Sequence, residues 1–235
     1  MQVRVGAAGG RAIVALALAA MLGGCAKSAN EHGAGNGNGN GKSADASTAA
    51  KESPAAARGG TIGAAGSACE LPVRFDIAKD WKAEAIEGQD ERSAASKGDD
   101  GNLSGALADA VLRQGPVTAV CEIDAKPAGN IGFLRVWTGR PGDADTGSVL
   151  RRFVAAEDNV SKPKYRSFKT GDGLSGVEVE YLYTSKLLEE TKKESAFAVS
   201  TPDGPVVLHL GGLDTEEHEA MRPAYDLAKH SLKLA

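Results

Sequence analysis

The chain has 235 residues, and its 27 lysines and arginines against 31 aspartates and glutamates give a formal net charge of −4. This balance excludes the basic surplus that draws proteins to nucleic acid, so nucleic-acid binding is not expected. The three cysteines are an odd number, which becomes informative if the chain leaves the cytoplasm.

Residues 1–24 have the layout of a secretory signal peptide. Arg4 and Arg11 precede an apolar run of roughly 11 residues, which is too short to cross a bilayer core of about 30 Å. Residues 22–25 read Leu-Gly-Gly-Cys and resemble the bacterial lipobox, in which the cysteine receives a diacylglyceryl group and the peptide is cut before it. The resemblance implies a mature protein that begins at a lipidated Cys25. The alternative is an ordinary signal peptide followed by a cysteine.

Lipid on Cys25 would make the membrane the first partner of this protein. One acyl chain gives only marginal membrane binding, whereas two hold a protein stably. No other apolar stretch approaches the roughly 20 residues that a spanning helix needs. The expected location is therefore the extracytoplasmic face of the cell membrane, with the lipid as anchor. Whether the new amine of Cys25 is acylated as well stays open.

Residues 35–43 read Gly-Asn-Gly-Asn-Gly-Asn-Gly-Lys-Ser and end like a phosphate-binding loop. That loop needs its first glycine at position 36, where this chain has Asn36, and it needs a strand before it and a helix after it. All three are missing, so a nucleotide site is not expected. Residues 25–68 are instead interpreted as the lipidated cysteine and a disordered Gly/Ala/Ser/Asn-rich tether with a reach of roughly 35 Å.

Residues 69–235 remain for a single folded domain. If lipid consumes one cysteine, Cys69 and Cys121 are left as a pair, and an oxidising compartment favours a disulfide between them. Such a bond would close a loop of about 50 residues, which the chain-entropy model values at roughly 4 kcal/mol. Two free buried thiols are the alternative.

Alternation of apolar and polar residues predicts mainly strands in this domain. The expected strands are residues 73–77, 117–123, 131–137, 165–170, 176–184, 196–201 and 205–210. Turn residues between neighbouring strands predict three hairpins, which join the second strand to the third, the fourth to the fifth and the sixth to the seventh.

Two helices are expected. Thr146 is predicted to cap the first, whose apolar face comprises Val149, Leu150, Phe153 and Val154, and Pro163 is expected to close that region. Asp214 and Glu217 predict a capping pair at the start of the second helix, which Pro223 is expected to kink or restart. Because strands outnumber helices and short turns join them, the predicted fold is an α+β sandwich, an antiparallel sheet with helices packed on it.

Three short motifs carry a resemblance to a known family. A strand at residues 73–77, the pair Asp80-Trp81 after it, and a Ser-Leu-Lys-Leu tail at residues 231–234 resemble actinobacterial lipoproteins whose domains share the PsbP-like α/β sandwich. The resemblance covers residues 69–235. It implies the fold, a place in the cell envelope and a binding or accessory role, and it transfers no catalytic residue.

No catalytic or metal-binding set stands out in the sequence. His218 and His230 are 12 residues apart on one predicted helix, too distant to share an ion, so neither a metal nor a cofactor is expected. His209, in the last predicted strand, is a candidate general base, and the pairs at 189–190 and 216–217 are candidate carboxylates for a surface hydrolase. No Gly-x-Ser-x-Gly elbow accompanies them.

Trp81 and Trp137 are candidates for the floor of a ligand groove, but core packing is the favoured use. Residues 87–105 are expected to form a polar surface loop. The sequence favours a lipid-anchored envelope protein whose domain binds a small ligand or an envelope partner without catalysis. A surface-anchored hydrolase and a purely structural or assembly role are the alternatives.

Overall fold

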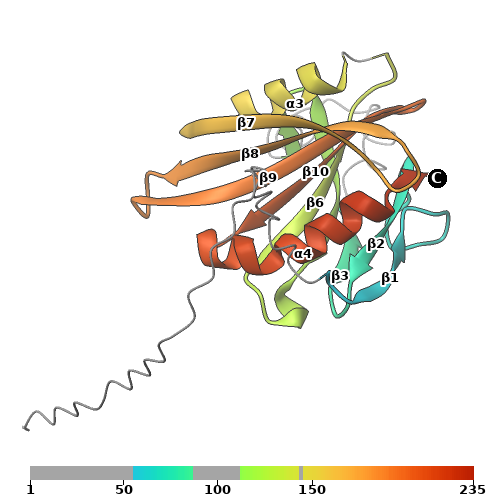
Figure 1. The fold of residues 1–235 in the computed structure, drawn as a ribbon, viewed down its shortest axis with the longest axis horizontal. Coiled ribbons are helices and arrows are strands. Elements are labelled where there is room, and N and C mark those ends of the chain that lie inside the picture. The colour runs from blue at the N-terminus through green and yellow to red at the C-terminus, as the bar shows by residue number, and fades with distance from the viewer. Residues whose placement is uncertain (1–54, 87–111, 143–144) are drawn as a thin grey trace, which may run out of the picture. The chain divides into compact units, whose positions relative to one another are not determined.

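The computed structural model describes residues 55–86, 112–142 and 145–235 (Figure 1). The expected signal peptide at residues 1–24, the lipidated Cys25 and the expected polar loop at residues 87–105 lie outside these ranges. None of the helices in the described ranges combines the length and the apolar character that a membrane crossing requires.

A large antiparallel sheet forms the centre of the domain. Its strand order is β3-β5-β6-β10-β9-β8-β7, and β4 also pairs with β5. The strands are β3 Lys82–Ala85, β4 Arg113–Gln114, β5 Val117–Asp124, β6 Gly132–Thr138, β7 Val160–Lys169, β8 Ser175–Ser185, β9 Glu190–Thr201 and β10 Gly204–Gly212. The pairings β5–β6, β7–β8 and β9–β10 confirm the three hairpins predicted from alternation and turn residues.

A second, small sheet has the order β1-β2-β11, with β1 at Arg58–Ile62, β2 at Val73–Ala78 and β11 at Lys233–Leu234. The expected domain boundary at Cys69 is therefore wrong, because the folded part already includes β1. The glycines near β1 suggested a linker, yet Gly63 has φ of 103° and a Cβ there would collide with the carbonyl of Val73. Close approach of two strands requires that glycine.

Helix α3, Thr146–Ala155, and helix α4, Thr215–Ser231, pack on opposite faces of the large sheet (Figure 1). A short 3-10 helix, η2 at Lys126–Ala128, lies between β5 and β6. The predicted α+β class, an antiparallel sheet with helices packed on it, is confirmed.

Three details of the predicted elements change. Asp145, and not Thr146, caps α3, because its carboxylate accepts a hydrogen bond from the Ser148 backbone nitrogen. Pro163 lies inside β7, which an edge strand permits, especially at the irregular register found there. Helix α4 runs without interruption through Pro223, so the expected restart is wrong.

Of the two hydrogen bonds that the predicted capping pair of α4 would make, one is present. The Asp214 carboxylate accepts a hydrogen bond of 2.8 Å from the Glu217 nitrogen. The Glu217 carboxylate does not return to the cap and instead accepts a 3.0 Å bond from the Ile131 nitrogen. This second bond joins the start of α4 to the segment that leads into β6.

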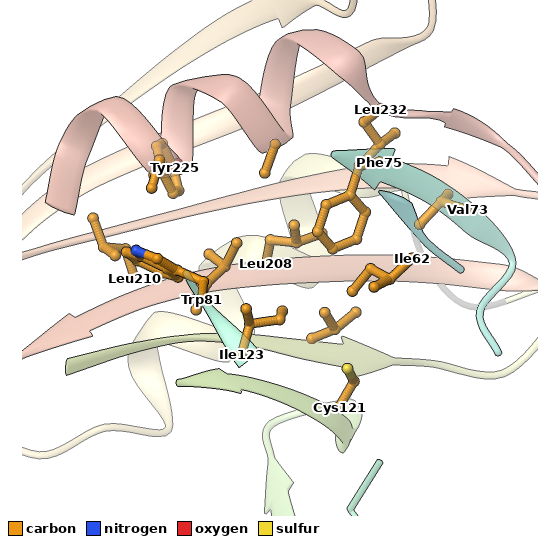
Figure 2. Close-up of a cluster of buried hydrophobic side chains, with 14 of the residues drawn as sticks. Ile62, Val73, Phe75, Trp81, Cys121, Ile123, Leu208, Leu210, Tyr225 and Leu232 are labelled. Atoms are coloured by element: carbon orange, nitrogen blue, oxygen red, sulfur yellow. The ribbon is translucent and has the colours of Figure 1, made fainter. Parts of the chain in front are cut away.

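The two faces of the large sheet carry two hydrophobic cores. The larger one lies between the large sheet, α4 and the small sheet (Figure 2), and the other lies under α3. Because successive residues of a strand point to opposite faces, Leu208 and Leu210 of β10 enter the first core and Val207 enters the second. Cys69 and Cys121 are buried in the larger core, where they form a disulfide bond with their Cα atoms 6.0 Å apart.

Candidate functional site

A pocket of about 600 Å³ opens at one end of the large sheet, on the face that carries α3. Phe133 of β6, Tyr183 of β8 and Lys192 of β9 line it. Each lies an even number of residues from a side chain of the core under α3, so all three point to that face. Its volume is in the range of small-molecule sites. We call it the sheet-end pocket.

Three loops supply the apolar walls of the sheet-end pocket. Ile131 precedes β6, Leu188 belongs to the β8–β9 turn, and Leu213 joins β10 to α4. These side chains are 56%, 60% and 49% exposed, and the adjacent Leu187 is 90% exposed. Large aliphatic residues from three separate loops therefore border one opening, which is the pattern of a binding surface.

Cations of the protein engage the aromatic residues of the pocket floor. The Arg135 guanidinium lies 4.3 Å from the centre of the Phe133 ring, and Lys192 Nζ lies 5.4 Å from the centre of the Tyr183 ring. A Cβ at Gly211 would come within 2.8 Å of the Phe133 ring, so the glycine lets this ring lie close to the β10 backbone.

Lys192 connects the pocket floor to a buried polar network. Its Nζ donates to the Gly212 carbonyl at 2.6 Å and lies 3.0 Å from Oε1 of Glu194. The other oxygen of Glu194 accepts from His209 Nε2 at 2.7 Å and from the Tyr181 hydroxyl at 3.1 Å. Tyr181 also lies 2.8 Å from Oε2 of Glu157. Neighbours thus occupy both oxygens of Glu194.

The pKa values of the two carboxyl groups in this network shift in opposite directions. Burial alone would raise the pKa of Glu194, but the neighbouring His209 and Lys192 outweigh burial and lower it to about 2. Burial and the Glu194 charge raise the pKa of Glu157 above its ordinary value. Glu194 is therefore a fixed anion at neutral pH, and its charge is balanced within the fold.

A second polar network lies on the opposite face, against α4. Glu178 of β8 is 5% exposed and accepts bonds from Arg222 at 3.1 Å and from Lys229 at 3.0 Å. Glu180 accepts from Arg222 and from Arg166, each at 2.8 Å. The pairs of Glu178 with Arg222 and Lys229 attach α4 to the sheet through charges that are largely removed from water, whereas Arg166 and Glu180 are partly exposed.

Arg222 also donates to the Ser195 hydroxyl at 3.1 Å, and that hydroxyl lies 3.2 Å from Nε2 of His218. Since Arg222 can only donate, the serine proton is directed at His218. Burial first and Arg222 second lower the pKa of His218 to about 4, so its ring is neutral at pH 7. Ser195 is completely buried, and His218 Nδ1 has no hydrogen-bond partner among the described residues.

Among the described residues, the candidate hydrolase groups do not meet in one catalytic set. Ser195 and His218 form a pair beside a pocket of about 330 Å³, but the serine is completely buried, and no carboxylate in the described ranges orients the histidine. His209, the expected general base, contacts Glu194 and Tyr181 and forms no hydrogen bond to a serine or aspartate of the described ranges. Within the described ranges, no three histidine, cysteine, aspartate or glutamate side chains gather as a metal site.

Both tryptophans pack in hydrophobic cores, as favoured from the sequence, and do not form a common ligand groove. Trp81 packs in the larger core and Trp137 in the core under α3, so the two rings lie on opposite sides of the large sheet. Both side chains are buried, and each fills its core with a large apolar area.

The other expected site residues lie apart from one another. Glu190 lines the sheet-end pocket, whereas the Glu217 carboxylate accepts a hydrogen bond from the Ile131 nitrogen. The two acidic pairs therefore do not form one site. The pocket itself was missed. Its signal in the sequence was the pair Leu187-Leu188 between polar residues in a hairpin turn, where apolar residues are not expected.

The chain is similar to a known protein structure and matches a known protein family. The structure is similar to the solution structure of cyanobacterial PsbP (CyanoP) from Synechocystis sp. PCC 6803, with 11% sequence identity and a TM-score of 0.44, over 75% of this chain and 98% of that one. No curated protein matches the chain. A family model described as an uncharacterised lipoprotein matches residues 39–232. The chain therefore belongs to this family of uncharacterised lipoproteins.

Proposed function

We propose that this protein is an envelope lipoprotein, held at the extracytoplasmic face of the cell membrane by lipid on Cys25, whose domain is a non-catalytic binding module. Membership of a lipoprotein family and the Leu-Gly-Gly-Cys sequence at residues 22–25 support the anchor. The partner of the domain is a small ligand, and its site is the sheet-end pocket.

The observation that carries the binding role is the sheet-end pocket itself. It combines a typical ligand-site volume with exposed aliphatic walls from three loops. Its floor is preorganised, since Lys192 is fixed by Gly212 and Glu194, and Glu194 in turn by His209. A rigid floor under accessible walls suits recognition, because little conformational entropy is lost when a ligand binds.

Binding of the neutral fluorescent probe N-phenyl-1-naphthylamine tests the site. The mature protein is expected to increase the fluorescence of the probe saturably, with one probe per protein. Leu188→Glu places a carboxylate in the wall and should weaken probe binding at least tenfold, whereas Leu234→Glu, at a side chain 43% exposed on β11, should not. Absence of saturable binding to the wild type, or equal loss in both variants, would refute the assignment of the site.

The anchor is tested separately. Cys25→Ala should move the protein from membranes into the medium and from the detergent phase into the aqueous phase on partitioning. A wild-type protein that already partitions as a water-soluble species after processing would contradict the anchoring proposal. That result would leave the ligand site to be judged on the probe experiment.

A further inference from the structure

We infer that the ligand of the sheet-end pocket is the hydrocarbon chain of an amphiphile. This inference rests on the proposed binding function and specifies the chemical class of its ligand. It is carried by the polar groups around the pocket, by the surroundings of its two rings, and by the extent of the apolar surface at its mouth.

Several polar groups that line the pocket are already engaged within the protein. Lys192 is held by the Gly212 carbonyl and by Glu194. Glu122 accepts two bonds from the Arg135 guanidinium, and Asp124 accepts a 2.9 Å bond from the Lys126 nitrogen. A polar ligand would therefore exchange its water largely for the apolar walls formed by Ile131, Leu188 and Leu213, which is unfavourable. A hydrocarbon chain has no such loss.

The rings of the floor are engaged from within the protein. Phe133 lies between the Arg135 guanidinium and the Gly211 backbone, and the Lys192 ammonium lies over Tyr183. Apart from Lys126, the side chains that the three loops contribute to the pocket are aliphatic. Contact with aliphatic groups is non-directional and grows with the apolar area buried, which suits a flexible chain.

The apolar surface extends beyond the pocket. Leu187, at the tip of the β8–β9 turn, is 90% exposed and adjoins Leu188 in the wall. A ligand apolar along its length can continue from the pocket over this tip. Roughly 30 residues separate Cys25 from β1, and even fully extended they span at most about 120 Å. The domain is thus kept close to the membrane proposed to hold it, which is a source of such chains.

Displacement of N-phenyl-1-naphthylamine by short amphiphiles tests the inference. Octyl, decyl and dodecyl chains, each on maltoside, trimethylammonium and carboxylate head groups, are titrated below their micelle concentrations. The dissociation constant is expected to fall about two- to fourfold for each added methylene and to depend little on the head group. Leu188→Glu should weaken the displacement by decyl maltoside, and the matched Leu234→Glu should leave it unchanged.

Each other outcome has a defined meaning. Probe binding without displacement by the chains, or displacement that is independent of chain length, would overturn the inference and leave the proposed function standing. Loss of probe binding altogether would overturn the proposed function. Displacement of the probe by phosphatidylcholine vesicles but not by monomeric amphiphiles would show that the loops dock on a bilayer. Loss of probe binding as the protein dimerises at higher concentration would show that a second copy covers the pocket. Both of these results would overturn the inference.

Discussion

The Glu194 carboxylate accepts a 2.7 Å hydrogen bond from His209, and this bond lies between the interior under α3 and the floor of the sheet-end pocket. On the interior side, the His209 ring packs edge-on against Phe153 of α3, with ring centres 5.7 Å apart. On the pocket side, the same carboxylate holds Lys192 at 3.0 Å. The charge of one buried residue therefore fixes both the helix-facing core and the proposed ligand site.

Replacing that charge should destabilise the fold. Glu194→Gln is expected to lower the free energy of unfolding by about 3 kcal/mol in urea denaturation at pH 7, because His209 and Lys192 lose a buried anion. Glu219→Gln removes a carboxylate from an exposed pair with Lys193 and should change stability by less than about 1 kcal/mol. Equal effects of the two substitutions would show that the buried network contributes little.

The same carboxylate predicts an acid transition. Its folded pKa of about 2 lies below its ordinary 4.5, so the unfolded chain takes up the proton first as pH falls. The stability that Glu194 contributes is complete above about pH 4.5 and is lost as pH falls towards 2. The difference in unfolding free energy between wild type and Glu194→Gln should therefore shrink across this window.

His218 predicts a second pH dependence at milder acidity. Its folded pKa of about 4 lies below its ordinary 6.5, so the unfolded state binds a proton between these values while the folded state does not. Stability should fall as pH drops from 6.5 to 4, by about 1.4 kcal/mol for each unit of pKa difference. His218→Gln should flatten the melting-temperature profile between pH 6.5 and 4.5. The exposed His230, replaced by glutamine, should leave the profile unchanged.

The α4 network predicts a contrast between two arginines that share Glu180. Arg222→Ala is expected to cost about 3 kcal/mol, because the buried Glu178 and the Ser195 hydroxyl lose a donor along with Glu180. The exposed Arg166, replaced by alanine, should cost less than about 1 kcal/mol. Urea denaturation measures both, and a larger loss for Arg166 would contradict the assigned roles.

The disulfide predicts a large loss when either cysteine is removed. Cys69 and Cys121 are 52 residues apart in the chain, so the chain-entropy model gives about 4 kcal/mol for this cross-link. Cys69→Ala alone should lower the unfolding free energy almost as much as replacement of both cysteines, because either change opens the same loop. If the unfolded, unreduced wild-type domain showed two alkylatable thiols by mass spectrometry, the cross-link would be disproved.

The sequence predicted those strands whose signal is local. The hairpin β9–β10 carries alternating apolar residues on both arms and a Pro-Asp-Gly turn at residues 202–204, so nearby residues determine it. β1, Arg-Gly-Gly-Thr-Ile, and β3, Lys-Ala-Glu-Ala, have little apolar character. They are strands because β2 and β5 supply their backbone hydrogen bonds, which is information from distant parts of the chain.

The candidate site was beyond local prediction for a related reason. The pocket walls come from three loops, and the network behind the floor joins Tyr181, Glu194, His209 and Glu157 from separate elements. Nothing in the spacing of these residues shows which ones meet. For the two tryptophans, the sequence favoured core packing over a groove, and only the order of the strands places the rings on opposite faces.

The position of the cystine just after the first strand has a mechanical consequence. A pull that arrives along the N-terminal chain acts first on β1, whose bonds to β2 can be unzipped one after another. The unravelling stops at Cys69, because the covalent bond there transfers the load to Cys121 in β5 of the large sheet. Tension on the N-terminal chain can therefore unravel only the segment before Cys69, and beyond that point the large sheet bears the load.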